Sequence, residues 1–452
     1  MPIRRWLRYR ACAGRRVRPG NNTHPHVREG VSVNPIRTRR SALKALGSAA
    51  LLAASGTVPS ATAAVADERE SRPSVVLDWY DATATTISAA GAATQITNSR
   101  TWAVSWLAAA RATREVPLGV DRSDFQDAAL ASAVHDSLVA LAPSRTQELD
   151  AALRATLDRV PDGPAKTKGA AAGAREARLV LASREGDGLD PASVNAPFTV
   201  PPAAPGVWQP TPPAYATAAQ YGNRIARPFL LVGPDQYRLP APPVLDSARY
   251  RADLAEVRAY GAMNSSVRTE RQTETAIFWF GSSLTLYIEP LRVALARAPH
   301  STAGQARLVA LFHVALVETQ IATSDTKYTY LRWRPVTAIH AGAIDPDPEW
   351  TPLHITPAHP DYPSGHNTYA GAAETVLTAL TGSRTGPFEL TSPTAPGVTR
   401  TYTAWRQLSQ DNLDARVYSG IHTRSADEAG LVLGKRVAEH TLHNAERLFG
   451  VL

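Results

Sequence analysis

The sequence has almost no cysteine and few patterns that predict β-strands. Its single cysteine among 452 residues is Cys12, so a fold held together by disulfides within the chain is excluded. Alternation of apolar and polar residues is nearly absent, whereas apolar residues recur three and four positions apart through much of the chain. With 44% hydrophobic residues, the chain can build a substantial core. The sequence therefore predicts an all-α helical bundle.

Acidic residues are also scarce near the N-terminus. Residues 1–66 contain twelve of the 48 lysines and arginines but only one of the 40 acidic residues, and the formal net charge is +8. The rest of the chain is therefore slightly acidic. Because the positive charge belongs to this one segment, the composition does not predict a nucleic-acid partner.

The basic N-terminal segment is typical of an export signal. Thr38–Lys44 contains a twin-arginine pair, a modestly apolar run follows at 45–55, and small residues at 61–66 offer cleavage sites. The apolar run is too short to span a bilayer stably. We interpret residues 1–66 as an N-terminal extension and twin-arginine signal peptide, with the true start codon left open. The predicted location is secreted or in the cell envelope, without a stable membrane span in the mature chain.

Residues 67–452 are predicted to form a single all-α domain with long proline-rich loops, and its motif-bearing core spans about 300–452. Two helices are expected over 75–110 with a break near Thr97–Ser99, and a long amphipathic helix over 302–325. Residues 197–213 are rich in proline but include Phe198 and Trp208. Since a flexible linker would be less aromatic, we expect a loop that packs across the domain and rims a pocket.

The stretch His359-Pro-Asp-Tyr-Pro-Ser-Gly-His366 has the composition of a helix N-terminus that binds an anion. Apolar spacing after Pro363 predicts a helix from Ser364 that stops near Gly382. The unpaired backbone N–H groups at such a start favour phosphate-like anions. Gly365 permits close approach of the backbone, the Ser364 side chain adds a hydroxyl, and His366 can move a proton near neutral pH. Alone, this stretch also fits an ordinary turn and helix cap.

Two basic segments flank this stretch, and each has a spacing that can direct charge to the same point. Lys327 and Arg334 are seven residues apart, so both fall on one face of a helix, and Pro335 then favours an extended Arg334 near a helix end. Arg416 and His422 are six apart and would diverge by about 120° on an unbroken helix. We expect Ser419-Gly420 to break the helix and to let them converge.

This combination predicts an oxyanion site. A lysine, two arginines and two histidines at a helix N-terminus carry too much positive charge for a packed core unless an anion offsets it. Arginine donates bidentate hydrogen bonds and lysine supplies a point charge, which together suit phosphate or vanadate.

The order Lys-x6-Arg-Pro, Pro-Ser-Gly-His and Arg-x5-His resembles the signature shared by type 2 phosphatidic acid phosphatases, bacterial acid phosphatases and vanadium-dependent haloperoxidases. The sequences of residues 333–339 and 350–366 look most like those of the bacterial haloperoxidase branch. The resemblance runs from about Val75 to the C-terminus. It implies a vanadium-dependent haloperoxidase, an enzyme of the peroxidase class, with a helical bundle fold.

The resemblance implies a role for each motif residue. His422 would be the axial ligand to the vanadium of bound vanadate, and His366 the acid and base. Lys327 would polarise the bound peroxide, so that a halide attacks oxygen and leaves as hypohalous acid. The implied partners are hydrogen peroxide and a halide, and an organic acceptor and a homo-oligomer stay open. The remaining vanadate-binding residues would be Arg334, Ser364, Gly365 and Arg416.

Two alternatives use the same residues. In an exported acid phosphatase, His422 would form a phosphohistidine and His366 would protonate the leaving alcohol. A non-catalytic, exported oxyanion-binding protein would keep the cluster without turnover. One departure from the superfamily pattern bears on this choice: the acid often found four residues after the second histidine is Ala426 here. The partner that orients His422 would then be Asp427, Glu428, Asp411, Asp414 or a backbone carbonyl.

The other histidines are interpreted as structural or loop residues without a role in the oxyanion site. Helical context favours structural or partly exposed roles for His135 and His313, and likewise for Glu318. His340, His354 and His359 are expected in loops, and only His359 is close enough in sequence to Ser364 to be of interest.

Overall fold

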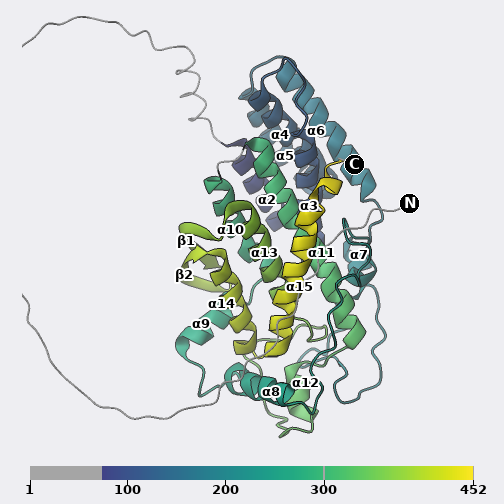
Figure 1. Cartoon of the computed structure of the whole chain (residues 1–452), viewed down its shortest axis with the longest axis vertical. Coiled ribbons are helices and arrows are strands. Elements are labelled where there is room, and N and C mark those ends of the chain that lie inside the picture. Colours follow the sequence, from purple (N-terminus) through teal and green to yellow (C-terminus); the bar gives the residue numbers. More distant parts are fainter. Residues whose placement is uncertain (1–73, 299–300, 451–452) are drawn as a thin grey trace, which may run out of the picture. The chain divides into compact units, whose positions relative to one another are not determined.

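The computed structural model of the protein describes residues 74–298 and 301–450 and is built almost entirely of helices (Figure 1). This confirms the predicted all-α bundle. The predicted signal peptide lies outside the described residues, so it and the division at residue 66 stay predictions. The helices are α2 (Val75–Ala90), α3 (Gln95–Ala112), α4 (Arg122–Leu141), η1 (Pro143–Arg145), α5 (Thr146–Asp158), α6 (Pro164–Ser183), α7 (Pro191–Val194), η2 (Tyr221–Ile225), α8 (Ala248–Gly261), α9 (Glu270–Phe278), α10 (Ser283–Arg297), α11 (Thr302–Tyr330), α12 (Pro335–Ala341), α13 (Gly365–Thr381), α14 (Trp405–Tyr418), α15 (Arg424–His443) and η3 (Ala445–Leu448).

The first helices break at a different place from the one predicted. α2 ends at Ala90 and α3 begins at Gln95, whereas Thr97–Ser99 lies inside α3. The Asn98 side chain explains the shift, because its Oδ1 accepts from the Ala92 N–H (2.8 Å) and its Nδ2 donates to the Ala92 carbonyl (2.9 Å). The polar residues that suggested a break therefore hold the preceding turn closed.

The long helix α11 forms the centre of the bundle and delivers the chain to Lys327. It packs against α3, α13 and α15. Within the described residues, it is the helix long and apolar enough to cross a membrane by length and composition, but 89% of the apolar window is buried inside the protein. These properties fit a core helix that is covered by neighbours on all sides.

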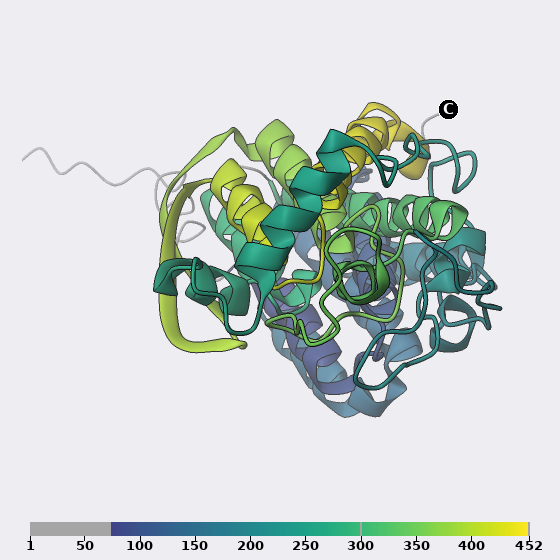
Figure 2. The same cartoon turned by 90° about the horizontal axis from the view of Figure 1, so that it is seen from below.

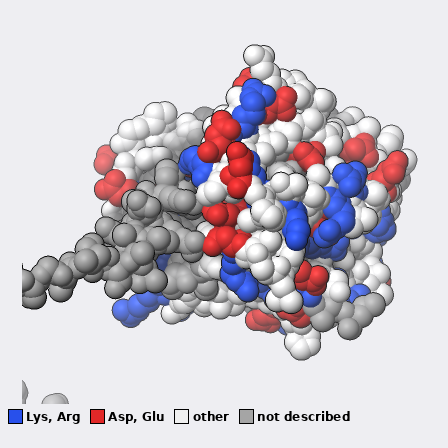
Figure 3. All heavy atoms as spheres, turned by 90° about the horizontal axis from the view of Figure 1, so that it is seen from above, with Lys and Arg blue, Asp and Glu red and all other residues white. Residues whose placement is uncertain are grey.

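On the face seen in Figure 3, acidic and basic side chains are interspersed.

The irregular middle of the chain is tied to α11 by buried carboxylates. Glu318 accepts from the backbone N–H groups of Phe229 (2.5 Å) and Leu231 (2.7 Å). Asp325 accepts from Arg238 (2.7 Å) and lies 3.3 Å from Arg224. The expectation that Glu318 is structural agrees with these bonds.

The proline-rich segment packs across the domain as predicted. The backbone N–H of Trp208 donates to the Leu331 carbonyl (2.6 Å), and the backbone N–H of Trp333 donates to the Gly206 carbonyl (2.9 Å). The segment therefore pairs with the connection between Lys327 and Arg334, which lies at the end of the bundle where α8 and α12 are seen in Figures 1 and 2.

A β-hairpin is the one extended element in the described chain, and the sequence did not predict it. β1 (Arg384–Ser392) pairs antiparallel with β2 (Ala395–Ala404), and Phe388 and Leu390 point to the buried face. The alternation covers too few residues to stand out among the helical spacings around it.

Glycines bring α13 and α15 into direct backbone contact. A Cβ added at Gly434 would lie 1.9 Å from the Thr368 carbonyl oxygen, and one at Gly430 would lie 2.6 Å from that of Ser364. On the facing helix, a Cβ at Gly371 would lie 2.3 Å from the Leu431 carbonyl oxygen. This glycine seam fixes the separation between the start of α13 and the turn that precedes α15.

We predict that Gly434→Ala lowers the free energy of unfolding by about 1–3 kcal/mol, because the added methyl group must push the two backbones apart. Urea denaturation followed by circular dichroism measures this. The control is Val432→Ala on the same helix, where the side chain is 43% exposed and a change within about 0.5 kcal/mol is expected. Equal midpoints for Gly434→Ala and the unmodified protein would contradict the seam.

Candidate active site

The start of α13 is open to a ligand. Ser364 is the N-cap with extended angles (φ −68°, ψ 121°), and its side chain makes no capping bond. A Cβ added at Gly365 would meet nothing within 4 Å, so free space lies in front of this backbone. The helix then ends at Gly382 (φ 88°), as predicted. The first N–H groups of α13 are therefore available to an anion.

Lys327 lies in the last turn of α11 and is 1% exposed. Its Nζ donates to the carbonyls of Pro360 (2.5 Å) and Asp361 (3.1 Å), in the turn just before Ser364. Burial, and then the positive charge of Arg334, lower the pKa of Lys327 well below its ordinary value. An anion beside Nζ would raise that pKa again.

Arg334 joins the three motif regions. The helix ends before it: Leu331 takes left-handed angles (φ 49°), and Arg334 is the extended N-cap of α12 before Pro335. Lys327 and Arg334 thus belong to two helices, which corrects the single helical face predicted for them. The Arg334 Nε donates to the His359 carbonyl (2.7 Å), and its Nη1 donates to the Ile421 carbonyl (2.6 Å) and lies 3.1 Å from His422 Nε2.

Arg416 and His422 lie on either side of the predicted break. α14 ends at Tyr418, and Gly420 (φ 77°) reverses the chain before α15. Both side chains are 1% exposed. The Arg416 Nη1 donates to the Trp279 carbonyl (3.1 Å), whereas its buried Nε has no acceptor among the described residues.

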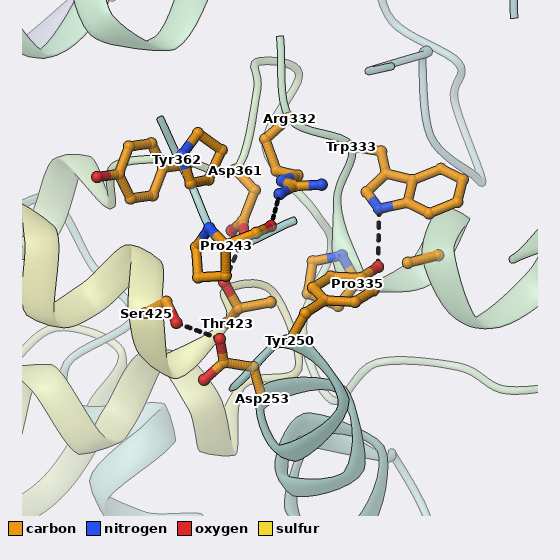
Figure 4. Close-up of a pocket in the computed structure, with 12 residues that line it drawn as sticks. Pro243, Tyr250, Asp253, Arg332, Trp333, Pro335, Asp361, Tyr362, Thr423 and Ser425 are labelled. Carbon is orange, nitrogen blue, oxygen red and sulfur yellow. Dashed lines mark hydrogen bonds between the residues drawn. The ribbon is translucent and has the colours of Figure 1, made fainter. Parts of the chain in front are cut away.

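The orienting partner of His422 is Asp361, which was not among the predicted candidates. His422 Nδ1 lies 2.6 Å from Asp361 Oδ1, and Thr423 donates its hydroxyl to Oδ2 (2.7 Å). Figure 4 shows Asp361 between Arg332 and Thr423. Burial raises the pKa of Asp361 to about 6, against the opposing effect of Arg334.

The four acids proposed from the sequence each have other partners. Asp427 is buried beside Ser364 and accepts from Asn367 Nδ2 (2.7 Å). The remaining pairs are Asp411 with Arg400, Asp414 with Arg424, and Glu428 with Arg249. The acid nearest the superfamily position therefore lies at the Ser364 side of the site and not at His422.

The partners of His422 select one tautomer. A carboxylate accepts at Nδ1, and a guanidinium, which can only donate, faces Nε2. A neutral ring with its proton on Nδ1 satisfies both contacts. Burial, and then Arg334 and Lys327, lower the pKa of His422 well below its ordinary value, so the ring is neutral. Nε2 consequently presents a lone pair to the cations.

His366 is oriented by a carbonyl. Its Nε2 lies 3.0 Å from the Gly281 carbonyl oxygen, which can only accept, so Nε2 carries the proton and Nδ1 holds a lone pair. Burial, and then Arg416, lower the pKa of His366 to about 3. It is less deeply buried than Lys327, Arg334 or His422 and marks the open side of the site.

Sequence reasoning treated His359 as a loop histidine, but it belongs to the site. Its Nδ1 lies 3.0 Å from Arg334 Nη2, and burial lowers the pKa of His359 well below its ordinary value. His354 lies nearby and stacks on Phe280 with ring centroids 4.1 Å apart. The signal for His359 was its place three residues ahead of Tyr362-Pro363-Ser364, because a turn must bring that loop back to the helix start.

Of the other histidines, His135 and His313 have the structural surroundings expected from the sequence, whereas His340 does not lie in a loop. The two ring nitrogens of His135, on α4, each lie 2.8 Å from a carboxylate, that of Asp136 on the same helix and that of Asp150 on α5. His313 is buried and stacks on Trp102 at 4.6 Å. His340 was expected in a loop but lies in α12, and its Nε2 lies 2.7 Å from the Trp350 carbonyl oxygen.

Comparison with known proteins agrees with this arrangement. A family model for the second helical-bundle domain of VCPO matches residues 307–450. The vanadium chloroperoxidase of Curvularia inaequalis is 26% identical over 228 residues, which covers 36% of this chain. The match spans only 37% of that relative's length.

Solved structures share the fold over most of the described chain. A bacterial vanadium-dependent iodoperoxidase superposes with a TM-score of 0.69 at 23% identity, covering 81% of this chain and 95% of that one. A holo-type bacterial vanadium-dependent chloroperoxidase gives 0.60 at 16% identity, covering 79% and 93%. Residues 307–450 thus match the second helical-bundle domain of the vanadium haloperoxidases, and the described chain shares their fold. The likeness at these identities shows the shared fold, and the chemistry has to be argued from the site.

The site of this protein, which has the fold of the vanadium haloperoxidases, fits a tetrahedral oxyanion. The unpartnered Arg416 Nε is a buried donor, and the space before Gly365 would hold the ligand's oxygens. Lys327, Arg334 and the Ser364 hydroxyl supply further donors, and His422 Nε2 supplies a neutral nitrogen ligand.

Asp361→Leu keeps the side-chain size but removes the hydrogen-bond acceptor at His422 Nδ1. We predict that the His422 ring of this variant populates both neutral tautomers. Nitrogen-15 spectra of histidine-labelled protein would show this. The loss of the buried counter-charge should also lower the free energy of unfolding by about 3–5 kcal/mol. Thr423→Val is the matched control, with a loss of about 1 kcal/mol and an unchanged His422 tautomer expected. An unaltered His422 signal in Asp361→Leu would contradict the assignment.

Anion binding should take up protons. A bound anion offsets Arg416 and its neighbours, so it raises the pKa of His366 from about 3, and protons bind wherever the pH lies between the free and bound values. Affinity for the anion should therefore fall as pH rises through the bound-state pKa. Sulfate suits the test, because its own charge is constant above pH 4.

Calorimetric titration with sulfate at pH 5, in buffers of different ionisation enthalpy, gives the number of protons taken up. His366→Ala should reduce that number, whereas His443→Ala, at an exposed position of α15, should not. Equal uptake in both variants would show that His366 is not coupled to the anion.

Proposed function

We propose that this site binds vanadate and uses hydrogen peroxide to oxidise a halide to hypohalous acid. The observation that carries the proposal is the neutral His422 Nε2, held by Asp361 and facing a ring of buried cations. A neutral imidazole fixed from behind by a carboxylate is the usual arrangement of a histidine that ligates a metal. The match of residues 307–450 to the family model and the fold shared with vanadium haloperoxidases support the same assignment.

When bound, vanadate supplies a Lewis-acidic centre at which peroxide is activated without a change in metal oxidation state. The guanidinium groups of Arg334 and Arg416 would hold its oxygens, with the Ser364 hydroxyl and the Gly365 N–H donating to them. His422 Nε2 would be the metal ligand. Since Arg334 and Arg416 are buried, their charges act in an environment of low polarity and their interactions are correspondingly strong.

His366 is placed to move the protons. Its Nδ1 carries the free lone pair, so it can accept a proton from incoming peroxide and return it to a departing water. The Lys327 ammonium would be the donor that polarises peroxide at this site and makes it more electrophilic toward a halide. The identity of the halide stays open.

An acid phosphatase is the second candidate, and the same observation favours it. A neutral His422 with a lone pair on Nε2 and a carboxylate behind it is also a nucleophile suited to attack phosphorus. The non-catalytic alternative loses the argument that supported it, because the missing acid after His422 is replaced by Asp361.

The two activities are separated by paired assays on the purified protein. We expect vanadate-dependent oxidation of iodide by hydrogen peroxide, with bromide and chloride tested alongside. Lys327→Ala should reduce the rate about 100- to 1,000-fold, as when one donor to a developing charge is lost. Lys168→Ala, an exposed lysine on α6, serves as the control.

Hydrolysis of a phosphate monoester without vanadate, together with no halide oxidation, would instead establish the phosphatase. If neither reaction occurs while sulfate still binds, the protein is an oxyanion-binding protein. A His422→Ala variant that retains full halide oxidation would refute the site assignment.

A further inference from the structure

The chain contains few of the side chains that an oxidant such as hypohalous acid attacks first. Its sulfur atoms are those of Met1, Cys12 and Met263, three among 452 residues. Thiolates and thioethers are the groups on which such oxidation begins. Within the described chain, Met263 therefore carries the single sulfur atom, and this residue is 57% exposed.

The electron-rich indole rings are withdrawn from solvent, in contrast to this thioether. The described tryptophans are at most 7% exposed, and they are Trp79, Trp102, Trp106, Trp208, Trp279, Trp333, Trp350 and Trp405. A neutral oxidant that leaves the anion site therefore meets one accessible thioether on a surface that otherwise offers it neither sulfur nor indole among the described residues.

Met263 lies on a segment that packs against the turn before His422. α8 ends at Gly261, and a Cβ added there would lie 2.5 Å from the Gly420 Cα. The backbone N–H of Met263 then donates to the Thr351 carbonyl (2.8 Å), within an antiparallel contact between the two segments. The thioether is thus fixed beside the backbone reversal that places His422.

The segment paired with Met263 leads to the open side of the site. It continues into His354, whose ring stacks on Phe280 with centroids 4.1 Å apart. The next residue is Gly281, whose carbonyl oxygen lies 3.0 Å from His366 Nε2. Met263 is therefore linked by direct contacts to the segments that carry both motif histidines.

We propose that Met263 is a modification site, at which hypohalous acid made by this protein converts the thioether to methionine sulfoxide. This inference rests on the proposed halide oxidation. The sulfur gives an electron pair to the halogen of hypohalous acid, the halogen–oxygen bond breaks, and hydroxide leaves. The oxygen of a water then bonds to sulfur while the sulfur–halogen bond breaks and halide departs. Of the two protons that this water loses, one neutralises the hydroxide and one enters solution.

The exposure of Met263 makes this modification compatible with the fold. A sulfoxide is polar and would disrupt a packed core, but at a position that faces water it remains solvated. Position adds to exposure, because an oxidant released nearby meets this side chain at a raised effective concentration before it mixes with the solution. Oxidation during turnover should therefore favour Met263 over an equally accessible methionine placed far from the site.

Leu118 offers such a distant position. It is 99% exposed and lies between α3 and α4, where nearby Arg114 donates to the Phe449 carbonyl and the Phe449 ring lies under Arg307 of α11. From Arg307 to Lys327 the same helix extends roughly 30 Å. Figure 1 shows α8, which precedes Met263, at the end of the bundle opposite to α4.

The test uses the full-length Leu118→Met variant, in which two exposed methionines compete within one chain. Peptide mass spectrometry gives the ratio of sulfoxide at Met263 to sulfoxide at the introduced methionine. Added iodine, which forms hypoiodous acid in water, should oxidise the more exposed introduced methionine at least as much as Met263. Turnover with vanadate, iodide and hydrogen peroxide, with free methionine as a scavenger in solution, should raise the ratio at least about threefold. The same mixture without iodide gives the background to subtract.

Met263→Leu is the second variant. Its initial rate of iodide oxidation should equal that of the unmodified protein, and its peptide containing residue 263 should gain no oxygen. Iodide oxidation with the same sulfoxide ratio as with added iodine, or the same gain of oxygen in the Met263→Leu peptide, would overturn the modification site and leave the proposed function standing. If no halide is oxidised, the proposed function is refuted and the inference fails with it.

Discussion

Burial of three cations around one space is the constraint on which the rest of this structure depends. Lys327, Arg334 and Arg416 are each no more than 1% exposed. Two buried carboxylates lie near them, but Asp361 is bound to His422 and Asp427 to Asn367. Removing charges from water is strongly unfavourable unless opposite charge is close. The site is therefore organised to be completed by an anion.

Several backbone features hold the cations in place against their mutual repulsion. Left-handed turns at Leu331 and Gly420 end the helices that carry Lys327 and Arg416. The glycine seam keeps α13 against α15, so the free N–H groups at the start of α13 face the turn that holds His422. The hydrogen bonds of Lys327 and Arg334 to nearby carbonyls then satisfy their donors while no anion is bound.

The sequence predicted the helices and the motif residues because both depend on local patterns. It did not predict Asp361 as the partner of His422, because the two residues are 61 apart in the chain and no local pattern links them. A contact of that kind depends on tertiary packing. His359 stood out only by its closeness in sequence to Ser364, and its contact with Arg334 likewise depends on tertiary packing. The turn at Gly91 was not predicted because the role of Asn98 depends on which carbonyl its amide reaches.

The arrangement of charge also separates the reactants by type. Halide and vanadate are anions, so the buried cations would attract both, whereas hypohalous acid is neutral and gains little from those charges. The charge distribution would thus favour release of the neutral product from the site that formed it.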